Sequence, residues 1–353
     1  MTKIMMSNKT KDLLEWINKL KGGDWLFEPV IKWSGSKRSQ AEEILKHFPK
    51  EINTYYEPFI GGASVLRRLL ESDIKVKKYC CSDVNDDLIS LWKLIKSNPR
   101  LVADSYKEMW NELNIDDDKN RKREYFYMVR DRFNKEKFAT DFMFIMRTTT
   151  NGMPRYNKNG EFNNSFHITR NGIIPETLEK IIFEWSKLLN ENNVIFETKD
   201  YKEIKSKIND FLYLDPPYAN TKGMYYGNLN NEELWEWLRQ QRGNYVLSFD
   251  GKSGEEDNTY AVPNDIYDNH LYLLSGNSSF KRTIGKSNDS IVYESLYIKE
   301  NNKVIYYEED ISELQNFIKQ TDGLRLSEKQ FNEFINIIKN SQLENVEIST
   351  TNF

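Results

Sequence analysis

Cysteine and histidine are scarce in this chain of 353 residues, and their scarcity excludes several kinds of site. The two cysteines, Cys80 and Cys81, are adjacent, and neighbouring cysteines rarely bridge each other, so a disulfide framework is not expected. The three histidines, His47, His167 and His270, are too scattered to indicate a zinc site or a catalytic triad. We therefore predict no metal site, and we expect both cysteines to be reduced, in a strand of a cytoplasmic protein.

Long apolar runs are also absent from the sequence. No stretch approaches the roughly 18 apolar residues that a membrane-spanning helix requires, and the N-terminus lacks the apolar core of a signal peptide. The composition, 39% hydrophobic and 29% charged, is that of an ordinary soluble protein with one large or two modest domains. We therefore expect no membrane partner.

The net charge of −4 argues against a nucleic-acid partner, but the distribution of charge favours one. Residues 119–170 carry twelve Lys and Arg against five Asp and Glu, a net charge of +7. Residues 300–353 carry five basic and ten acidic residues, a net charge of −5. A basic segment of this kind commonly contacts phosphate. The alternative is a solvated helical face with i,i+4 ion pairs, which would explain part of 119–137.

Strands and helices alternate on both sides of the basic segment, which indicates an α/β fold. A buried strand at 54–59 leads through Gly61 and Gly62 into a helix, and a second strand at 76–82 ends at Asp83, before a helix at 84–97. Residues 99–190 are expected to be mostly helical, with a Gly/Asn-rich interruption at 151–172. Further strands are predicted at 194–197, 211–214, 244–249, 271–274, 290–298 and 303–307, and further helices at 10–21, 230–241 and 310–341.

The glycine turn after the first strand is a candidate binding site for an adenosine. Gly61 and Gly62 let a ligand approach the backbone closely, but they do not match the spacing of a pyrophosphate-binding loop. Asp83 follows the next strand, 21 residues after Gly62, where an acid can bind ribose hydroxyls. A site for ribose without a site for pyrophosphate indicates an adenosine such as S-adenosylmethionine. The alternative is a structural turn and a helix-capping aspartate.

The sequence Asp215-Pro216-Pro217-Tyr218 follows a short apolar strand and is the motif that says most about the reaction. Proline fixes φ and has no N–H, so the Asp215 carboxylate and the Pro216 carbonyl form a preformed pair of acceptors beside the Tyr218 ring. Such a pair can hold the two hydrogens of an amino group on a planar base. The alternative is an ordinary Pro-Pro turn with a capping aspartate.

These motifs together resemble those of the Dam-type adenine-specific DNA methyltransferases, in the family's order, over about residues 30–300. The resemblance is carried by five stretches: Ile31–Lys37, Glu57–Ser64, Ser82–Ile89, Arg147–Phe166 and Asp215–Tyr218. It implies a Rossmann-like class I methyltransferase sheet with a mostly helical and β-hairpin insertion that recognises DNA. The cofactor implied is S-adenosylmethionine, and the reaction is methyl transfer to the exocyclic amino group of a flipped adenine in double-stranded DNA.

The resemblance also implies roles for individual residues. Asp215, Pro216 and Tyr218 are expected to be catalytic, and Lys37 is expected to meet the methionine carboxylate. The cofactor contacts are expected at Trp33, Lys37, Phe59, Gly61, Gly62, Asp83, Tyr201 and Asp215, and the DNA contacts at Arg147, Asn151, Arg155, Asn157 and Asn163. Trp33 and Tyr201 could instead be core aromatics, and Arg155 could contact phosphate instead of guanine.

The expected domains follow the motifs. A helical extension at 1–30 precedes a catalytic domain built from 31–98 and 191–300, which encloses the DNA-recognition region at 99–190; an acidic, helical extension occupies 301–353. We expect a monomer in the cytoplasm of a bacterial cell, at its nucleoid, or one encoded by a phage.

Departures from the family pattern leave the target sequence open. Ser165 stands where the family often has proline, and Thr148, Thr149 and Thr150 stand where it often has aromatics, so GATC or a related short site is an open expectation. A ribosomal RNA base methyltransferase and a non-catalytic DNA-binding relative are the alternatives. Methylation of the cytosine ring carbon would require a nucleophilic cysteine, and both cysteines belong to the strand before Asp83.

Overall fold

The computed structural model describes residues 29–149, 152, 154–217, 229–253, 256–257, 259–277 and 291–300. The chain divides into two compact units, Met1–Glu300 and Asn301–Phe353, and all the described residues belong to the first. The helix predicted at 10–21, the strand predicted at 303–307 and the helices predicted at 310–341 lie outside the described residues.

One mixed sheet organises the described part of the chain, with the strand order β3-β2-β1-β4-β5-β8-β7 and with β6 pairing to β5 off this path. The strands are β1 (Glu51–Glu57), β2 (Lys75–Asp83), β3 (Ile195–Thr198), β4 (Phe211–Leu214), β5 (Asn244–Ser253), β6 (Glu256–Asp257), β7 (Asn269–Asn277) and β8 (Ile291–Lys299). The first five in the order are parallel, while β8 is antiparallel to both β5 and β7. The order reverses between β1 and β4, and such a reversal creates a crevice at the carboxyl ends of the strands.

The expected α/β fold with a Rossmann-like sheet is confirmed, and local chemistry explains the strand limits. Phe211–Leu214 is buried at every position, as a central parallel strand with both faces covered requires. The strand β1 begins three residues before the predicted start at 54 and ends at Glu57, opposite Cys81. It cannot continue because Pro58 has no N–H for the ladder.

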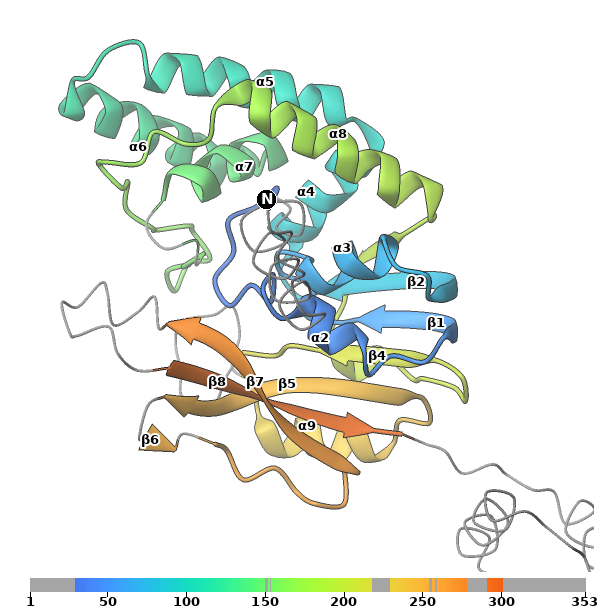
Figure 1. Ribbon diagram of the computed structural model, residues 1–353. Helices are drawn as coiled ribbons and strands as arrows, with labels where there is room; N and C mark the ends of the chain where they lie inside the picture. The colour runs from blue at the N-terminus through green and yellow to red at the C-terminus, as the bar shows by residue number, and fades with distance from the viewer. Residues whose placement is uncertain are drawn as a thin grey trace, which may run out of the picture. The chain divides into compact units, whose positions relative to one another are not determined.

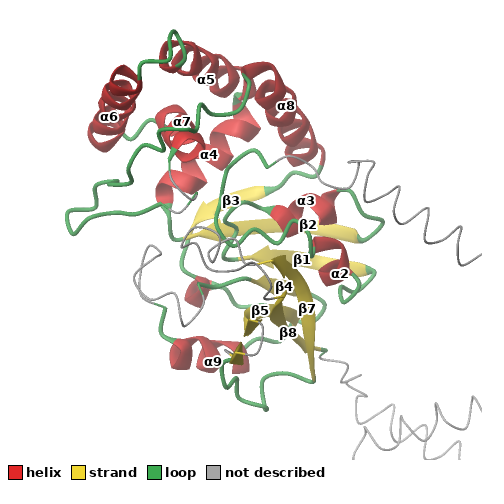
Figure 2. Cartoon of the chain, turned by 60° about the vertical axis from the view of Figure 1, so that its left-hand side comes forward, coloured by secondary structure: helices red, strands yellow, loops and turns green. Residues whose placement is uncertain are grey.

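Helices pack around the sheet, and several of them gather on one side of it. The helices are α2 (Ala41–Leu45), α3 (Ser64–Leu70), α4 (Asp86–Ser97), α5 (Pro99–Leu113), α6 (Lys119–Glu136), α7 (Ala139–Thr148), α8 (Pro175–Glu191) and α9 (Asn231–Arg239), with a short 3-10 turn at Tyr201–Glu203. Helices α5 to α8 gather beyond the β2 and β3 side of the sheet, while α9 lies at the β5 side (Figures 1 and 2). The predicted helical insertion therefore occupies one side of the sheet.

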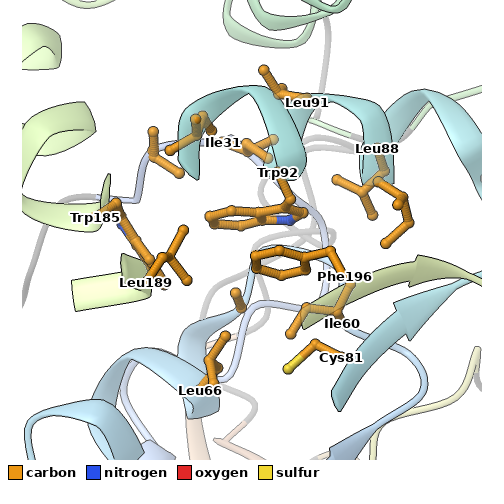
Figure 3. Packing of buried hydrophobic residues seen from close by; sticks show 14 of the residues in the cluster. Ile31, Ile60, Leu66, Cys81, Leu88, Leu91, Trp92, Trp185, Leu189 and Phe196 are labelled. Carbon is orange, nitrogen blue, oxygen red and sulfur yellow. The ribbon is translucent and has the colours of Figure 1, made fainter. Parts of the chain in front are cut away.

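Three large aromatic side chains, Trp92, Trp185 and Phe196, pack together within the hydrophobic core (Figure 3). The Trp92 ring of α4 stacks on Phe196 with ring centroids 5.6 Å apart, and it meets Trp185 of α8 at 4.9 Å. Trp92 is fully buried, and its Nε1–H donates to the Gly61 carbonyl at 3.1 Å. The hydrophobic core thus fixes the backbone of the glycine turn, because a buried indole N–H needs its acceptor.

Candidate active site

A cleft opens at the carboxyl ends of the parallel strands, at the point where the strand order reverses. The described residues among the predicted cofactor-binding and catalytic set all line it: Trp33, Lys37, Phe59, Gly61, Gly62, Asp83, Tyr201, Asp215 and Pro216. Tyr218 lies outside the described residues. Segments far apart in the sequence are therefore brought to one site by the topology of the sheet.

The glycine turn fits closely against Trp33. Gly61 has a φ of +44°, and a Cβ built on it would lie 2.8 Å from Trp33 Nε1, so only glycine is accommodated without movement. Ala63, at the start of α3, has a left-handed backbone with a φ of 55°. This is a strained conformation for alanine.

Asp83 is aimed into the cleft by backbone donors. Its Oδ1 accepts from the Asn85 N–H at 3.0 Å, and its Oδ2 accepts from the Gly61 N–H at 3.4 Å. Burial raises the pKa of Asp83 to about 6, against the opposing effect of these N–H donors. The carboxylate is thus joined to the glycine turn, next to which a ribose would lie.

An aromatic slot borders the same cleft. The Phe59 and Tyr201 rings have centroids 5.4 Å apart, and the edge of Tyr201 meets Trp237 at 5.2 Å. Tyr201 begins a 3-10 turn that the Asp200 side chain caps by accepting from the Lys202 N–H at 2.9 Å. The prediction that Phe59 and Tyr201 share one pocket is therefore consistent with their placement, and their apolar faces suit an adenine ring.

A buried ion pair forms the floor of the cleft at the end of β4. Lys37 Nζ lies 2.7 Å from Asp215 Oδ1 and 3.5 Å from Glu294 Oε2, and it donates to the Gly35 carbonyl at 3.1 Å. The Lys37 side chain is only 3% exposed. Burial alone would lower the pKa of Lys37, but the carboxylates of Asp215 and Glu294 raise it above its usual value. Lys37 is therefore held as a cation.

Three acceptors around Lys37 bear on its expected role. An ammonium group has three N–H donors, and Asp215, Glu294 and Gly35 each offer an acceptor. A methionine carboxylate would have to displace one of them, so this contact stays a prediction. The sequence motif located Lys37 in the cleft, but it gave no sign of Glu294, which comes from the distant strand β8.

Acidic groups near Lys37 influence one another. Burial raises the pKa of Asp215 to about 6; Lys37 opposes this rise and Glu294 adds to it. Burial also raises the pKa of Glu57 to about 8, with Asp215 contributing, while the Tyr55 hydroxyl donates to Glu57 Oε2 at 2.7 Å. Sequence reasoning passed over Glu57 as a site residue, although it begins the motif that contains Phe59 and Gly61.

The predicted hairpin is present, and hydrogen bonds join it to α6 and to the start of α4. Tyr156 bridges to Phe162 across the hairpin, and Phe162 exchanges two hydrogen bonds with Asn134 of α6. The Tyr156 hydroxyl donates to Asp87 Oδ2 at 2.7 Å and accepts from Asn85 Nδ2 at 3.4 Å. The hairpin is therefore joined to the first turn of α4, directly after Asp83.

The root of the hairpin meets the cleft itself. The Ser34 N–H donates to the Gly152 carbonyl at 3.0 Å, and a Cβ on Gly152 would lie 2.8 Å from the Lys32 carbonyl oxygen. Pro154, two residues further on, lines the cleft beside Trp33. The predicted DNA-recognition region is thus in direct contact with the segment that carries Trp33.

The predicted DNA-contacting residues differ in what their side chains do. The Arg147 guanidinium donates to the backbone carbonyls of Val30 and Pro29, and the Asn157 amide holds the hairpin turn through Glu161 and the Asn159 N–H. These side chains bind to the chain itself, so their DNA contacts remain predictions.

Arg155 and Asn163 are exposed, and the Asn163 N–H donates to the Arg155 carbonyl at 2.9 Å. Asn164, which the sequence reading missed, accepts from the Arg155 N–H at 2.6 Å. The backbone of Arg155 is therefore fixed while its side chain faces outward. Asn151 lies outside the described residues.

Five cations of residues 119–170 form ion pairs, three of them with aspartates outside the segment and two with aspartates inside it. The pairs are Arg121–Asp116, Lys122–Asp117, Arg130–Asp131, Arg132–Asp141 and Lys137–Asp87. None of these has the i,i+4 spacing of the alternative reading. Five exposed cations have no ion pair with a described residue: Lys119, Arg123, Lys135, Arg155 and Lys158.

Among the described residues, no three His, Cys, Asp or Glu side chains come together as a metal site would require. None of the described helices has both the length and the apolar character needed to cross a membrane.

The chain matches the family of D12 class N6 adenine-specific DNA methyltransferases over residues 33–254, and it belongs to this family. It is 35% identical over 208 residues to the type II methyltransferase M.MjaIII of Methanocaldococcus jannaschii, covering 54% of this chain and 69% of that protein. It is 31% identical over 195 residues to the DNA adenine methylase of Escherichia coli K12, and 32% identical over 198 residues to that of Haemophilus influenzae. Each of these two alignments covers 54% of this chain and 64% of the relative, slightly less than two thirds of its length.

A solved structure, the rRNA methyltransferase aviRa from Streptomyces viridochromogenes, aligns over 80% of this chain and 94% of that chain with 10% identity and a TM-score of 0.34. This similarity is too low to support an inference about fold or function. The resemblance that the motifs indicated is supported by the match to the D12 class family over residues 33–254.

Proposed function

We propose that this protein transfers a methyl group from S-adenosylmethionine to the exocyclic amino group of an adenine within a short, specific site of double-stranded DNA. The observation that carries the proposal is the position of Asp215 and Pro216 at the carboxyl end of β4, in one cleft with Asp83 and the Phe59–Tyr201 slot. The family of the chain supports the adenine specificity.

The residues of the cleft fit this methyl donor. The buried Asp83 carboxylate suits ribose hydroxyls, the Phe59–Tyr201 slot suits an adenine ring, and Gly61 leaves room that a Cβ would fill. S-adenosylmethionine supplies, when bound, an activated methyl group on a sulfonium. The remaining task of the protein is to place an amine in line with it and to exclude water.

Asp215 and Pro216 would orient that amine. The lone pair of an adenine amino group is delocalised into the ring, which makes the group a poor nucleophile. Acceptors at the Asp215 carboxylate and the Pro216 carbonyl would hold its two hydrogens and favour a geometry that frees the lone pair. Tyr218 would stack on the base. The adenine must leave the duplex to reach these groups, and unstacking costs a few kcal/mol.

Recognition of DNA would rest on the region 99–190, next to a catalytic domain formed by 31–98 and 191–300. The exposed Arg155, on a hairpin with a fixed backbone, suits the bidentate contact that arginine makes with guanine. The unpaired cations around it would contact phosphates and set the register. We place such a monomer in the cytoplasm, where DNA is accessible, and we leave GATC as one candidate site among related ones.

The test is methylation by the purified protein. Tritiated S-adenosylmethionine is incubated with unmethylated duplex DNA or with duplex RNA of the same sequence, and incorporation is counted. Wild-type protein is expected to label DNA, and Asp215→Ala to reduce labelling by about a thousandfold, because the groups that orient the amine are lost. Asp268→Asn, which removes a carboxylate from the opposite end of the sheet beside Lys299, is the control.

The outcomes separate the rival functions. Full activity of Asp215→Ala would contradict the assigned role of the Asp215 turn. Labelling of RNA in preference to DNA would favour the RNA methyltransferase, and labelling of neither would favour a non-catalytic DNA-binding protein. Methylation-sensitive long-read sequencing of DNA from cells that express the protein identifies the target site.

A further inference from the structure

Two serine hydroxyls meet inside the cleft, although their residues are far apart in the sequence. Ser36 Oγ lies 2.7 Å from Ser64 Oγ, and both residues line the cleft. Ser64 is only 6% exposed, and a buried hydroxyl is costly unless it has a hydrogen-bond partner, which Ser36 provides. The two side chains therefore form one polar pair in the cleft.

The local backbone favours this meeting of the two hydroxyls. Gly35, directly before Ser36, has a φ of +77°, a left-handed conformation that favours glycine. Ser64 follows the glycine turn, which the Ala63 N–H closes by donating to the Ile60 carbonyl at 2.8 Å. The pair is thus held in place before any ligand binds, which lowers the entropic cost of binding.

The serine pair can donate a hydrogen bond to a ligand. Two hydroxyls carry two hydrogens, and the bond between Ser36 and Ser64 uses only one of them. Among the described residues, no other group hydrogen-bonds to either side chain. The second O–H is therefore available to an acceptor in the cleft, and polarisation by the first hydrogen bond strengthens the bond that it donates.

Few groups in the cleft can receive the amino-acid part of the methyl donor. The adenosine part has partners in Asp83 and in the aromatic slot of Phe59 and Tyr201. The ammonium of the amino-acid part suits the carboxyl groups that line the cleft, whereas its carboxylate requires N–H or O–H donors. Lys37 is a cation there, but two carboxylates and the Gly35 carbonyl already surround its ammonium group. The serine pair offers a donor without displacing any of these contacts.

We propose that Ser36 and Ser64 bind the carboxylate of the methyl donor, and that Lys37 stays with Asp215 when the donor is bound. The proposal rests on the proposed function, since it concerns the amino-acid part of S-adenosylmethionine. It adds two hydroxyls to the cofactor contacts expected from the sequence, and it reassigns the contact expected of Lys37. Hydrogen bonds from hydroxyls to a carboxylate are charge-assisted and are therefore stronger than those between neutral groups.

The test compares two analogues that differ only in the carboxylate. S-adenosylhomocysteine carries it, whereas S-adenosyl-3-thiopropylamine keeps the amine and lacks the carboxylate. Their dissociation constants are measured by calorimetry at pH 7.5 for wild-type protein, the double variant Ser36→Ala/Ser64→Ala and the control Ser97→Ala, at an exposed serine that ends α4. We expect wild-type protein and the control to prefer S-adenosylhomocysteine. The double variant is expected to bind it about tenfold more weakly and to bind the thiopropylamine as before, because only the carboxylate loses its donors.

The thiopropylamine separates a lost carboxylate contact from a disrupted cleft, because a merely structural loss weakens both analogues equally. Equal weakening, an unchanged preference in the double variant, or a wild-type protein without the preference would overturn the proposal and leave the proposed function standing. If the double variant does not fold, Ser36→Ala is expected to bind S-adenosylhomocysteine about threefold more weakly and Ser36→Thr, which keeps the hydroxyl, to bind it as wild-type protein does. Equal binding by these two single variants would count against the proposal. Wild-type protein that binds neither analogue would refute the proposed donor, and with it this inference.

Discussion

Glu57 shows how burial at a binding cleft can place a proton on a carboxyl group. It is 3% exposed, and burial raises its pKa to about 8 in the folded protein, from about 4.5. The folded state therefore binds the proton more tightly than the unfolded state does. The contribution of Glu57 to stability is complete below about pH 4.5 and is lost as the pH rises toward about 8.

We predict that Glu57→Gln removes this part of the pH dependence. Glutamine matches glutamate in size and cannot ionise, so the variant is expected to lose less stability than wild-type protein between pH 5 and pH 8.5. Urea unfolding followed by circular dichroism at several pH values provides the measurement. Glu51→Gln, an exposed position on the same strand, is the control and is expected to follow the wild-type curve. Identical curves for Glu57→Gln and wild-type protein would show that Glu57 is ionised near neutral pH.

At the scale of elements, the hairpin matters through its connection to α4. The Tyr156 hydroxyl binds Asp87 and Asn85, and Asn85 both caps α4 and donates its N–H to Asp83. One hydroxyl thus joins the segment that carries Arg155 to the segment that would hold the cofactor ribose.

We predict that Tyr156→Phe weakens specific methylation without loss of cofactor binding. A hydrogen bond to a carboxylate is worth roughly 1.5 kcal/mol, which is about a tenfold fall in kcat/KM on the target DNA. S-adenosylhomocysteine is expected to bind with unchanged affinity, because Asp83 and its N–H donors remain. Tyr127→Phe, which keeps the Arg130 contact on the ring face, is the control. An equal, about tenfold loss of S-adenosylhomocysteine affinity in Tyr156→Phe would instead place the effect in the cofactor site.

How far the sequence could predict these elements depends on how local their causes are. The strand Phe211–Leu214 and the glycine turn are specified by neighbouring residues, and the sequence located both. Glu294 could not be found in this way, because its approach to Lys37 requires the antiparallel pairing of β8 and the bulge at Gly251. The site was therefore predictable where each motif ends its own strand, and unpredictable where a distant strand completes it.

At the scale of the whole molecule, the distinction between effects of neighbouring residues and effects of distant residues also applies to charge. The sum of +7 over residues 119–170 overstates the charge available to a partner, because Asp116, Asp117 and Asp87, which lie outside that segment, neutralise some of its cations. What remains are exposed cations in two places. Lys135 and Lys158 lie at the hairpin end of α6 and on the hairpin, whereas Lys119 and Arg123 lie in the first turns of α6.

We predict that only the cations near the hairpin contact DNA phosphates. Lys119 and Lys135 are separated by 16 residues of α6, about 24 Å along the helix, so one DNA contact surface need not include both. The double variant Lys135→Gln/Lys158→Gln is expected to reduce the slope of log K against log salt by about 1.8, since each lost phosphate contact removes about 0.9. Lys119→Gln/Arg123→Gln removes the same charge and is expected to leave the slope unchanged. Fluorescence anisotropy with a labelled duplex between 50 and 200 mM salt measures both, and equal losses in the two variants would mean that DNA responds to the overall charge and not to a defined surface beside the hairpin.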